Sequence, residues 1–362
     1  MVVSLSGAVY VFADELKLWL QHDRYILPEA EAGTPKPLST LIAIAEAQLP
    51  EGQQVSRVDL YPAKNRSWAF RAVATNPEGL GLWNYFKYYK RVFINPYTGA
   101  VTGVEDATHE FFQLTLELHM NLWLGKTYGY PIVSYATLIF VVMLLSGIVL
   151  WWPRSTKQKT LRRSLWLNTN VKRKRFNYDL HNIVGFYSFF MALILGITGL
   201  LFSFPILRDA YTGFFNSTSA APMHTAAAPA VTGYIPANHD DPLDNTLDFL
   251  LNAYPDAAMM SIRLKGSESP RVDVQVRLRE GRTGDFAWYY VEKDTHRIAD
   301  IVRSAELQTG DKLAALNYDI HTGGIGGLPT QLLACLISLF CASLPVTGYI
   351  LWWSKTKKRK RL

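Results

Sequence analysis

Charged residues are scarce in this sequence of 362 residues. Asp, Glu, Lys and Arg make up 19% of it and hydrophobic residues 49%, whereas charged residues form about 25% of a typical soluble domain. This composition excludes a disordered, collagen-like or coiled-coil chain and favours a membrane protein. Cysteine is scarce too, since the sequence contains two. A disulfide-stabilised scaffold and a cysteine-ligated zinc or iron–sulfur site are therefore excluded.

Three long stretches contain no charged residue, namely 127–153, 182–207 and 322–354. A helix rises about 1.5 Å per residue, so roughly 20 residues cross the apolar core of a bilayer. Each stretch is long enough. Buried helices of a soluble protein are the alternative, but a soluble domain rarely has three such stretches. The sequence therefore predicts three complete membrane-spanning helices.

The first 13 residues are apolar but too short to cross a bilayer, because they reach only about 20 Å as a helix. They also lack the basic start and the small-residue cleavage site of a signal peptide. We expect them to be the second half of a further membrane helix whose first half is missing from the sequence.

Two short segments are strongly basic. Residues 154–175 contain nine Lys or Arg and no acid, and the tail after Trp353 contains six more. Both follow a Trp-Trp pair at the end of an uncharged stretch, which is typical of cytoplasmic loops beside membrane helices. A nucleic-acid surface is the less favoured alternative. Both termini are then cytoplasmic, and 22–118 and 208–318 lie outside, in the periplasm of a Gram-negative cell.

The chain contains an internal duplication. SGIVLWW at 146–152 recurs as TGYILWW at 347–353, and Ser6-Gly7 recurs as Thr198-Gly199. Each half therefore reads as a helix, an outer segment and a second helix. Each outer segment is predicted to be a small α+β unit, with one helix, three strands and a turn. These elements are 38–49, 55–61, 68–74, 91–95 and 95–99 in the first, and 244–253, 259–264, 271–278, 287–292 and 294–296 in the second. An Ala- and Pro-rich linker is expected at 217–241.

Three of the eight histidines precede a membrane helix, and these are His119, His181 and His321. An ionisable side chain at a membrane boundary is costly, which indicates a function. The duplication places His119 and His321 at the same depth on the outer side, where they can face each other. His181 lies on the inner side. Its repeat-related partner would precede Met1, so its partner is expected to be missing from the sequence.

Two facing imidazoles in an apolar helical bundle predict a haem site. The sequence has no CxxCH motif, so the haem would be b-type. The lack of nearby carboxylates disfavours a di-iron or hydrolytic zinc site, and a two-histidine copper site remains an alternative. For His181 the alternative is that the chain binds one haem only.

Several motifs together resemble the PepSY-associated transmembrane family, and the resemblance extends over essentially the whole chain. The motifs are LHMNLWLG, DLHNIVGFY, SGIVLWWPR, NYDIHTGGIGGLP, TGYILWWSK and VFINPYTGAVTG. The family comprises bacterial inner-membrane proteins and includes iron-regulated ferric-siderophore reductases of the ferrioxamine-reductase type. The resemblance implies four transmembrane helices, here with the first truncated, and two periplasmic α+β PepSY-like domains.

The resemblance also implies two haems stacked across the membrane. His119 and His321 would bind the periplasmic haem iron, and His181 the cytoplasmic one. The corresponding segments are 1–21 (helix 1), 22–118 (first PepSY-like domain), 119–153 (helix 2), 154–180 (basic loop), 181–207 (helix 3), 208–320 (second PepSY-like domain with its linker), 321–354 (helix 4) and 355–362 (basic tail).

The implied function is electron transfer across the membrane to a ferric siderophore, which would release Fe(II). The sequence has no GxGxxG fingerprint, so the donor is expected to be a quinol or a separate reductase rather than a bound nicotinamide. No nucleic acid is expected as a partner. Two other functions remain open: a membrane-anchored PepSY module that regulates a periplasmic peptidase, and a siderophore permease.

Overall fold

The computed structural model describes residues 1–28, 33–152, 165–218, 233–264 and 270–359. The chain divides into two compact units. The helical unit consists of Met1–Phe12, Thr115–Arg208 and Ile320–Leu362, and the sheet unit consists of Ala13–Leu114 and Asp209–Asp319. The first part of the predicted basic loop, most of the Ala- and Pro-rich linker and the end of the basic tail lie outside the described residues.

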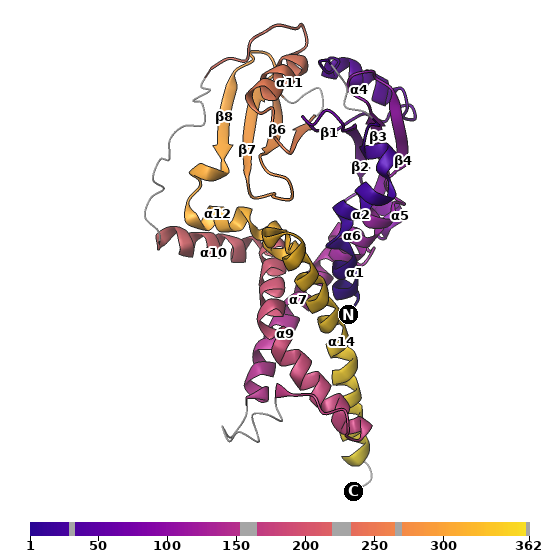
Figure 1. Ribbon diagram of the computed structural model, residues 1–362, viewed down its shortest axis with the longest axis vertical. Coiled ribbons are helices and arrows are strands. Elements are labelled where there is room, and N and C mark those ends of the chain that lie inside the picture. Colours follow the sequence, from indigo (N-terminus) through magenta and orange to yellow (C-terminus); the bar gives the residue numbers. More distant parts are fainter. Residues whose placement is uncertain (29–32, 153–164, 219–232, 265–269, 360–362) are drawn as a thin grey trace. The chain divides into compact units, whose positions relative to one another are not determined.

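Three long apolar helices form the helical unit: α7 (Lys126–Trp151), α9 (Arg173–Ser203) and α14 (Leu328–Arg359) (Figure 1). Each is long and apolar enough to cross a membrane, over Leu328–Ser354 in α14. They overlap the three uncharged stretches, but α9 begins within the predicted basic loop and α14 begins later than the predicted helix 4. Helix α9 packs against both α7 and α14, around a small core that includes Leu144, Ala192, Ile337 and Cys341.

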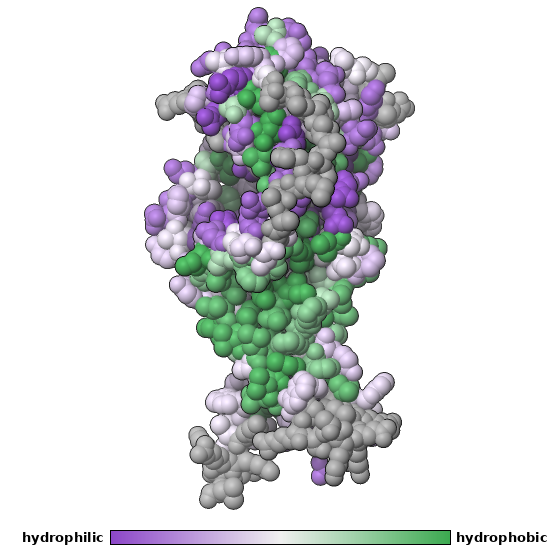
Figure 2. Space-filling model, turned by 90° about the vertical axis from the view of Figure 1, so that its left-hand side faces the viewer, coloured by the Kyte–Doolittle hydropathy of each residue, from purple (hydrophilic) through white to green (hydrophobic). Residues whose placement is uncertain are grey.

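The outward faces of these helices are apolar. Large hydrophobic side chains such as Ile139, Val149 and Leu150 of α7 are exposed, and Figure 2 shows a continuous hydrophobic surface over the helices. Water disfavours so much exposed apolar surface, whereas lipid does not. The chain is therefore a membrane protein with an α+β part, as the sequence predicted.

The first residues form the short helix α1 (Val2–Tyr10), which packs against α14. Its nine residues correspond to about 14 Å of helix at 1.5 Å per residue, less than the bilayer core. The other short helical elements are α2 (Ala13–Leu20), α3 (His22–Tyr25), α5 (Leu82–Tyr85), α6 (Phe111–Asn121), α10 (Pro205–Ser217), η1 (Ser304–Glu306), α12 (Thr309–Ala315), α13 (Asn317–Thr322) and η2 (Gly324–Gly326).

One antiparallel sheet of eight strands forms the centre of the sheet unit, in the order β4-β3-β2-β1-β5-β6-β7-β8. The strands are β1 (Arg57–Leu60), β2 (Trp68–Thr75), β3 (Phe86–Ile94), β4 (Val101–Asp106), β5 (Met259–Arg263), β6 (Arg271–Arg277), β7 (Phe286–Glu292) and β8 (Ile298–Arg303). Six of them match predicted strands. The sequence reasoning missed β4 and β8, which are the edge strands that follow the two predicted turns.

The two outer segments of the sequence join in this single sheet through β1 and β5, which pair antiparallel with Arg57 opposite Arg263. Helices α4 (Leu38–Glu46) and α11 (Pro242–Ala253) contact each other and share one core with the strands. Asp244 of α11 accepts hydrogen bonds from the backbone N–H (2.9 Å) and the hydroxyl (2.6 Å) of Ser39. The duplicated halves thus bury a common apolar face.

A fully buried carboxylate lies at the junction of the two halves. Asp59 of β1 accepts hydrogen bonds from Arg57 Nε (2.9 Å) and from the Ser261 hydroxyl (2.8 Å), and it also pairs with Arg71. Burial alone would raise the pKa of Asp59, but the charges of Arg71 and Arg57 and these hydrogen bonds lower it below its ordinary value of 3.8. The ionised carboxylate therefore stabilises the β1–β5 junction.

We predict that Asp59→Asn destabilises the sheet unit by about 3 kcal/mol, because breaking a buried ion pair leaves its partners uncompensated. Since the folded pKa is below the unfolded one, the stabilisation is present above about pH 4 and is lost as the pH falls through the folded value. Thermal unfolding in detergent at pH 7 and pH 3, with hydrogen exchange of the β1 and β5 amides, measures both effects. The exposed Asp256→Asn is the control; equal melting of both variants at pH 7 contradicts the prediction.

Candidate histidine site

The structure brings His119 and His321 together in the helical unit. His119 lies on α6 and His321 on α13, and their ring centres are 6.1 Å apart with an angle of 62° between the rings. An imidazole nitrogen binds a first-row metal at about 2.0–2.1 Å and lies roughly 1 Å from its ring centre, so two imidazoles on one ion have centres about 6 Å apart. The observed spacing matches that of two ligands of a single ion.

The hydrogen bond of His119 fixes which of its nitrogens is free. His119 Nδ1 lies 2.8 Å from the carbonyl oxygen of Val3 on α1. A carbonyl oxygen only accepts, so Nδ1 carries the proton and donates it. The lone pair of the neutral ring then belongs to Nε2, which is the nitrogen that can bind a metal.

The same tautomer follows for His321 from a hydroxyl on α9. The Thr198 hydroxyl donates to the Ile194 carbonyl oxygen at 2.7 Å, one turn earlier in its own helix. Its single proton is thereby used, so it accepts from His321 Nδ1 at 2.8 Å. His321 Nε2 is left with the lone pair, as in His119.

His181 lies elsewhere in the helical unit, within α9, and has an equivalent partner. The Thr347 hydroxyl of α14 donates to the Ser343 carbonyl oxygen at 3.1 Å and lies 2.8 Å from His181 Nδ1. The structure therefore places Nδ1 of His181 against a hydroxyl of α14, and it pairs His119 with His321.

A glycine beside each of these contacts leaves room for the ring. A Cβ added at Gly7 would lie 2.9 Å from His119 Cε1, one at Gly199 would lie 3.6 Å from His321 Cε1, and one at Gly348 would lie 3.4 Å from His181 Cε1. At Gly7 even a Cβ would displace the ring, whereas at Gly199 and Gly348 it would be in van der Waals contact with the ring. Each histidine thus contacts a Ser-Gly or Thr-Gly pair of a neighbouring helix.

The fourth such pair, Ser146-Gly147 of α7, differs. Its hydroxyl donates to the Met143 carbonyl oxygen at 3.1 Å, and both residues are exposed. A Cβ at Gly147 would meet no atom within 4 Å. In the described part of the chain this pair therefore has no histidine beside it.

A buried carboxylate precedes each of the three histidines by two residues, and these are Glu117, Asp179 and Asp319. Asp319 accepts hydrogen bonds from the backbone N–H groups of Thr283 (2.9 Å) and Gly284 (3.0 Å). Asp179 pairs with Arg175 at 2.9 Å. The contacts of Asp319 fix the short helix α13 that carries His321. In the sequence the three positions share the patterns ELH, DLH and DIH.

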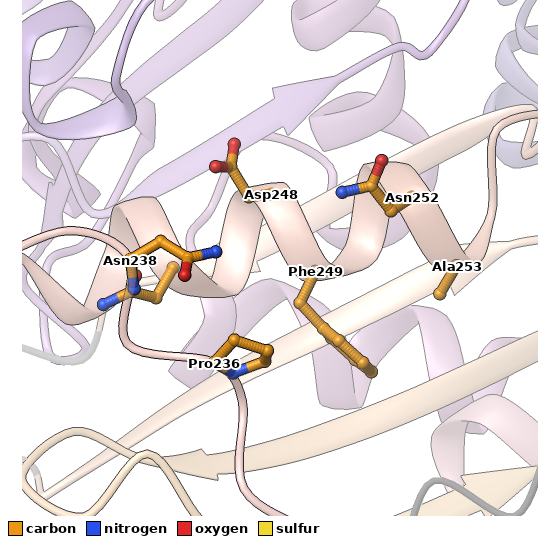
Figure 3. Close-up of a pocket in the computed structure, with 7 residues that line it drawn as sticks. Pro236, Asn238, Asp248, Phe249, Asn252 and Ala253 are labelled. Atoms are coloured by element: carbon orange, nitrogen blue, oxygen red, sulfur yellow. The ribbon is translucent and has the colours of Figure 1, made fainter.

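A different kind of site occurs on the sheet unit. A pocket of about 340 Å³ is lined by α11 and the segment before it, including Asp248, Phe249 and Asn252. Asp248 and Phe249 point to opposite sides of α11 (Figure 3), and Asp248 accepts a hydrogen bond from His239 at 2.7 Å. Within the described residues no group of three His, Cys, Asp or Glu side chains could hold a metal ion, so the paired histidines are the stronger candidate.

The fold and the site define an integral membrane protein in which Ser-Gly and Thr-Gly pairs of the helical unit lie against histidine rings of neighbouring helices. The chain belongs to the family of the PepSY-associated TM region, whose model matches residues 1–355. The family suspected from the sequence motifs is thereby confirmed. Comparison with curated proteins gives no match.

We predict that all three histidines are neutral Nδ1–H tautomers, observable by nitrogen-15 NMR of histidine-labelled protein in detergent without added metal. Thr198→Val removes the acceptor of His321 and should change the tautomer ratio of that ring alone. Ser188→Ala is the matched control, because the Ser188 hydroxyl makes the same bond to its own helix (2.6 Å to Val184). An Nε2–H signal for His119 in the unmodified protein would refute this assignment.

Proposed function

We propose that this protein is a b-type haem protein of the bacterial inner membrane that passes electrons to a ferric siderophore in the periplasm. The observation that carries the proposal is the pair His119 and His321, which have the spacing and the tautomer of two ligands of one iron. Haem iron, when bound, accepts and releases single electrons.

The residues present fit a haem better than a metal ion alone. Within the described residues no third metal-binding side chain joins the two imidazoles. A haem requires no third one, because the porphyrin nitrogens supply the other ligands of the iron. The Nδ1–H bonds orient both rings and increase the basicity of Nε2. Gly7 and Gly199 leave space beside them. A copper ion held by two histidines would lack such completing ligands.

The repeat supports four transmembrane helices in the family arrangement. Val3 and Gly7 of α1 contact His119 as Thr198 and Gly199 of α9 contact His321. We therefore treat α1 as the equivalent of the end of α9. The two PepSY-like domains are then the two halves of the sheet, β1–β4 and β5–β8.

The basic residues at the start of α9, Arg173 to Arg175, support a cytoplasmic location for that end. His181 lies one to two turns further and would hold a second haem on the cytoplasmic side. His119 and His321 would then face the periplasm. A quinol or a separate reductase would supply one electron for each ferric iron, and the ferrous product is held less tightly by hard oxygen ligands.

We predict that the protein purified with added haem has a sharp Soret band and, after dithionite, narrow α and β bands. His119→Ala and His321→Ala should each remove the haem of the pair, because one remaining imidazole binds iron far more weakly than two. His239→Ala, in the sheet unit, should leave the spectrum unchanged. Full spectra from both ligand variants contradict the ligand assignment. A colourless protein that restrains a peptidase instead supports the binding-module alternative, and one that carries the chelate across vesicles supports a permease.

Gly7→Val should weaken haem binding at the pair by at least tenfold, because its side chain would occupy the place of the His119 ring. Gly147→Val is the control, because Gly147 of α7 also follows a serine but has open space beside it. Haem titration followed at the Soret maximum measures both. Equal affinities for the two variants would show that the glycine beside His119 has no part in the site.

A further inference from the structure

Four arginines lie in one row across the middle of the sheet. Arg91 is paired with Arg71, Arg71 with Arg57, and Arg57 with Arg263, on the adjacent strands β3, β2, β1 and β5. Residues directly opposite in neighbouring strands project to the same face. This face is opposite to the one covered by α4 and α11, because the alternate residues Val58 and Ile262 belong to the shared core. Like charges in directly opposed positions destabilise a sheet, so the row needs a reason.

The carboxylates around the row are fewer than the cations. Asp59 is shared by Arg57 and Arg71. Glu105 is shared by Arg91 and Arg24, at 3.1 and 3.0 Å. Glu110 lies 3.8 Å from Lys17 and 3.9 Å from the same Arg91. Asp273 of β6 is a fourth carboxylate, and it lies directly opposite Arg263. Four carboxylates thus face six cations, namely Lys17, Arg24 and the four arginines of the row, so positive charge remains on this face.

The pKa shifts differ along the row. Despite burial, Asp59 raises the pKa of Arg71 and Tyr89 raises that of Arg91. Burial lowers the pKa of Arg57, and the charges of Arg71 and Arg263 lower it further, despite the nearby Asp59. Burial likewise lowers the pKa of Lys17, and Arg91 adds to the effect, despite Glu110. Positive neighbours therefore contribute to both shifts.

The row is open to solvent at its centre and at its β5 end. The side chains of Arg71 and Arg57 are 31% and 27% exposed, and Arg263 is exposed. The Arg263 guanidinium lies over the ring of Trp288 on β7, 4.7 Å from its centre. Trp288 stacks with Tyr290 at 6.3 Å and 15°. Asp273 on β6 lies opposite both Arg263 and Tyr290, so the row of four arginines ends at one carboxylate beside this aromatic pair.

We propose that the solvent-accessible arginines of the row, Arg71, Arg57 and Arg263, together with Trp288 and Tyr290, bind an anionic ferric chelate that carries catecholate rings. Guanidinium groups bind phenolate oxygens by charge-assisted hydrogen bonds, and aromatic rings stack on indole and guanidinium planes. A cationic hydroxamate chelate has neither the charge nor the rings. The proposal rests on the proposed function for the presence of iron in the ligand, and it specifies the class of siderophore.

The test uses gallium(III) chelates, because gallium(III) has the charge of ferric iron but is not reduced under these conditions. Binding is then measured independently of haem and electron transfer, so a failure of the proposed function leaves this result intact. The intact protein in detergent is titrated by calorimetry with the gallium complex of a tris-catecholate and with that of desferrioxamine B, which is cationic. We expect at least tenfold tighter binding of the catecholate complex, weakened by added salt.

Arg263→Glu should weaken binding of the catecholate complex at least tenfold. Arg263 is the variant of choice because it is exposed, whereas Arg57 and Arg71 hold the buried Asp59. Arg279→Glu is the control, a 70% exposed arginine that pairs with Asp285. Trp288→Leu provides a second, uncharged variant with the same expected direction, and the melting temperature of each variant verifies folding.

The proposal is overturned if the hydroxamate complex binds as tightly as the catecholate complex. It is also overturned if folded Arg263→Glu and Trp288→Leu proteins both retain the original affinity. Equal losses for Arg279→Glu and Arg263→Glu would show a general charge effect and would likewise overturn it.

Discussion

The hydrogen bond from a histidine Nδ1 to a neighbouring helix is the interaction on which the candidate site depends. It fixes the tautomer of the ring, directs Nε2 away from that helix and ties two helices at one level. The acceptor for His321 is the Thr198 hydroxyl, whose own proton is already donated to a carbonyl oxygen of α9. In His119 the acceptor is a main-chain carbonyl of α1, so the site requires that short helix to remain beside its partners. Pre-orientation of this kind lowers the cost of binding a metal, since the rings need no reordering.

The internal duplication repeats the contact between a histidine ring and a neighbouring helix. The pairs Ser6-Gly7, Thr198-Gly199 and Thr347-Gly348 each combine a hydroxyl with a position that lacks a side chain, and each has a histidine ring against it. In the sheet unit the duplication acts differently, because the halves share one core and one sheet through β1 and β5. A single repeat would leave this central strand edge and half of the apolar face exposed.

Much of this architecture follows from the sequence alone. Charge depletion located α7, α9 and α14, and the internal repeat predicted that His119 and His321 lie together, because equivalent positions in two repeats reach the same depth. The strands β4 and β8 were missed because Gly and acidic residues weaken their own strand propensity, which pairing to β3 and β7 compensates. The role of Thr198 was missed for another reason. A serine or threonine in an apolar helix ordinarily satisfies its own backbone, and only the neighbouring ring reveals its second bond.

The arginine row could not be predicted from any local sequence pattern. Arg57 and Arg263 are separated by some two hundred residues, and their opposition depends on the register of β1 against β5. A shift of one residue would turn one of them into the apolar core, so the register is fixed by burial and not by the arginines themselves. Arg57 and Arg71 hold the buried Asp59, and Arg91 pairs with the buried Glu105, whereas the exposed Arg263 is tolerated on the opposite face rather than required for folding there. Residues that a fold accommodates at an electrostatic cost without needing them are those whose presence is best explained by a ligand.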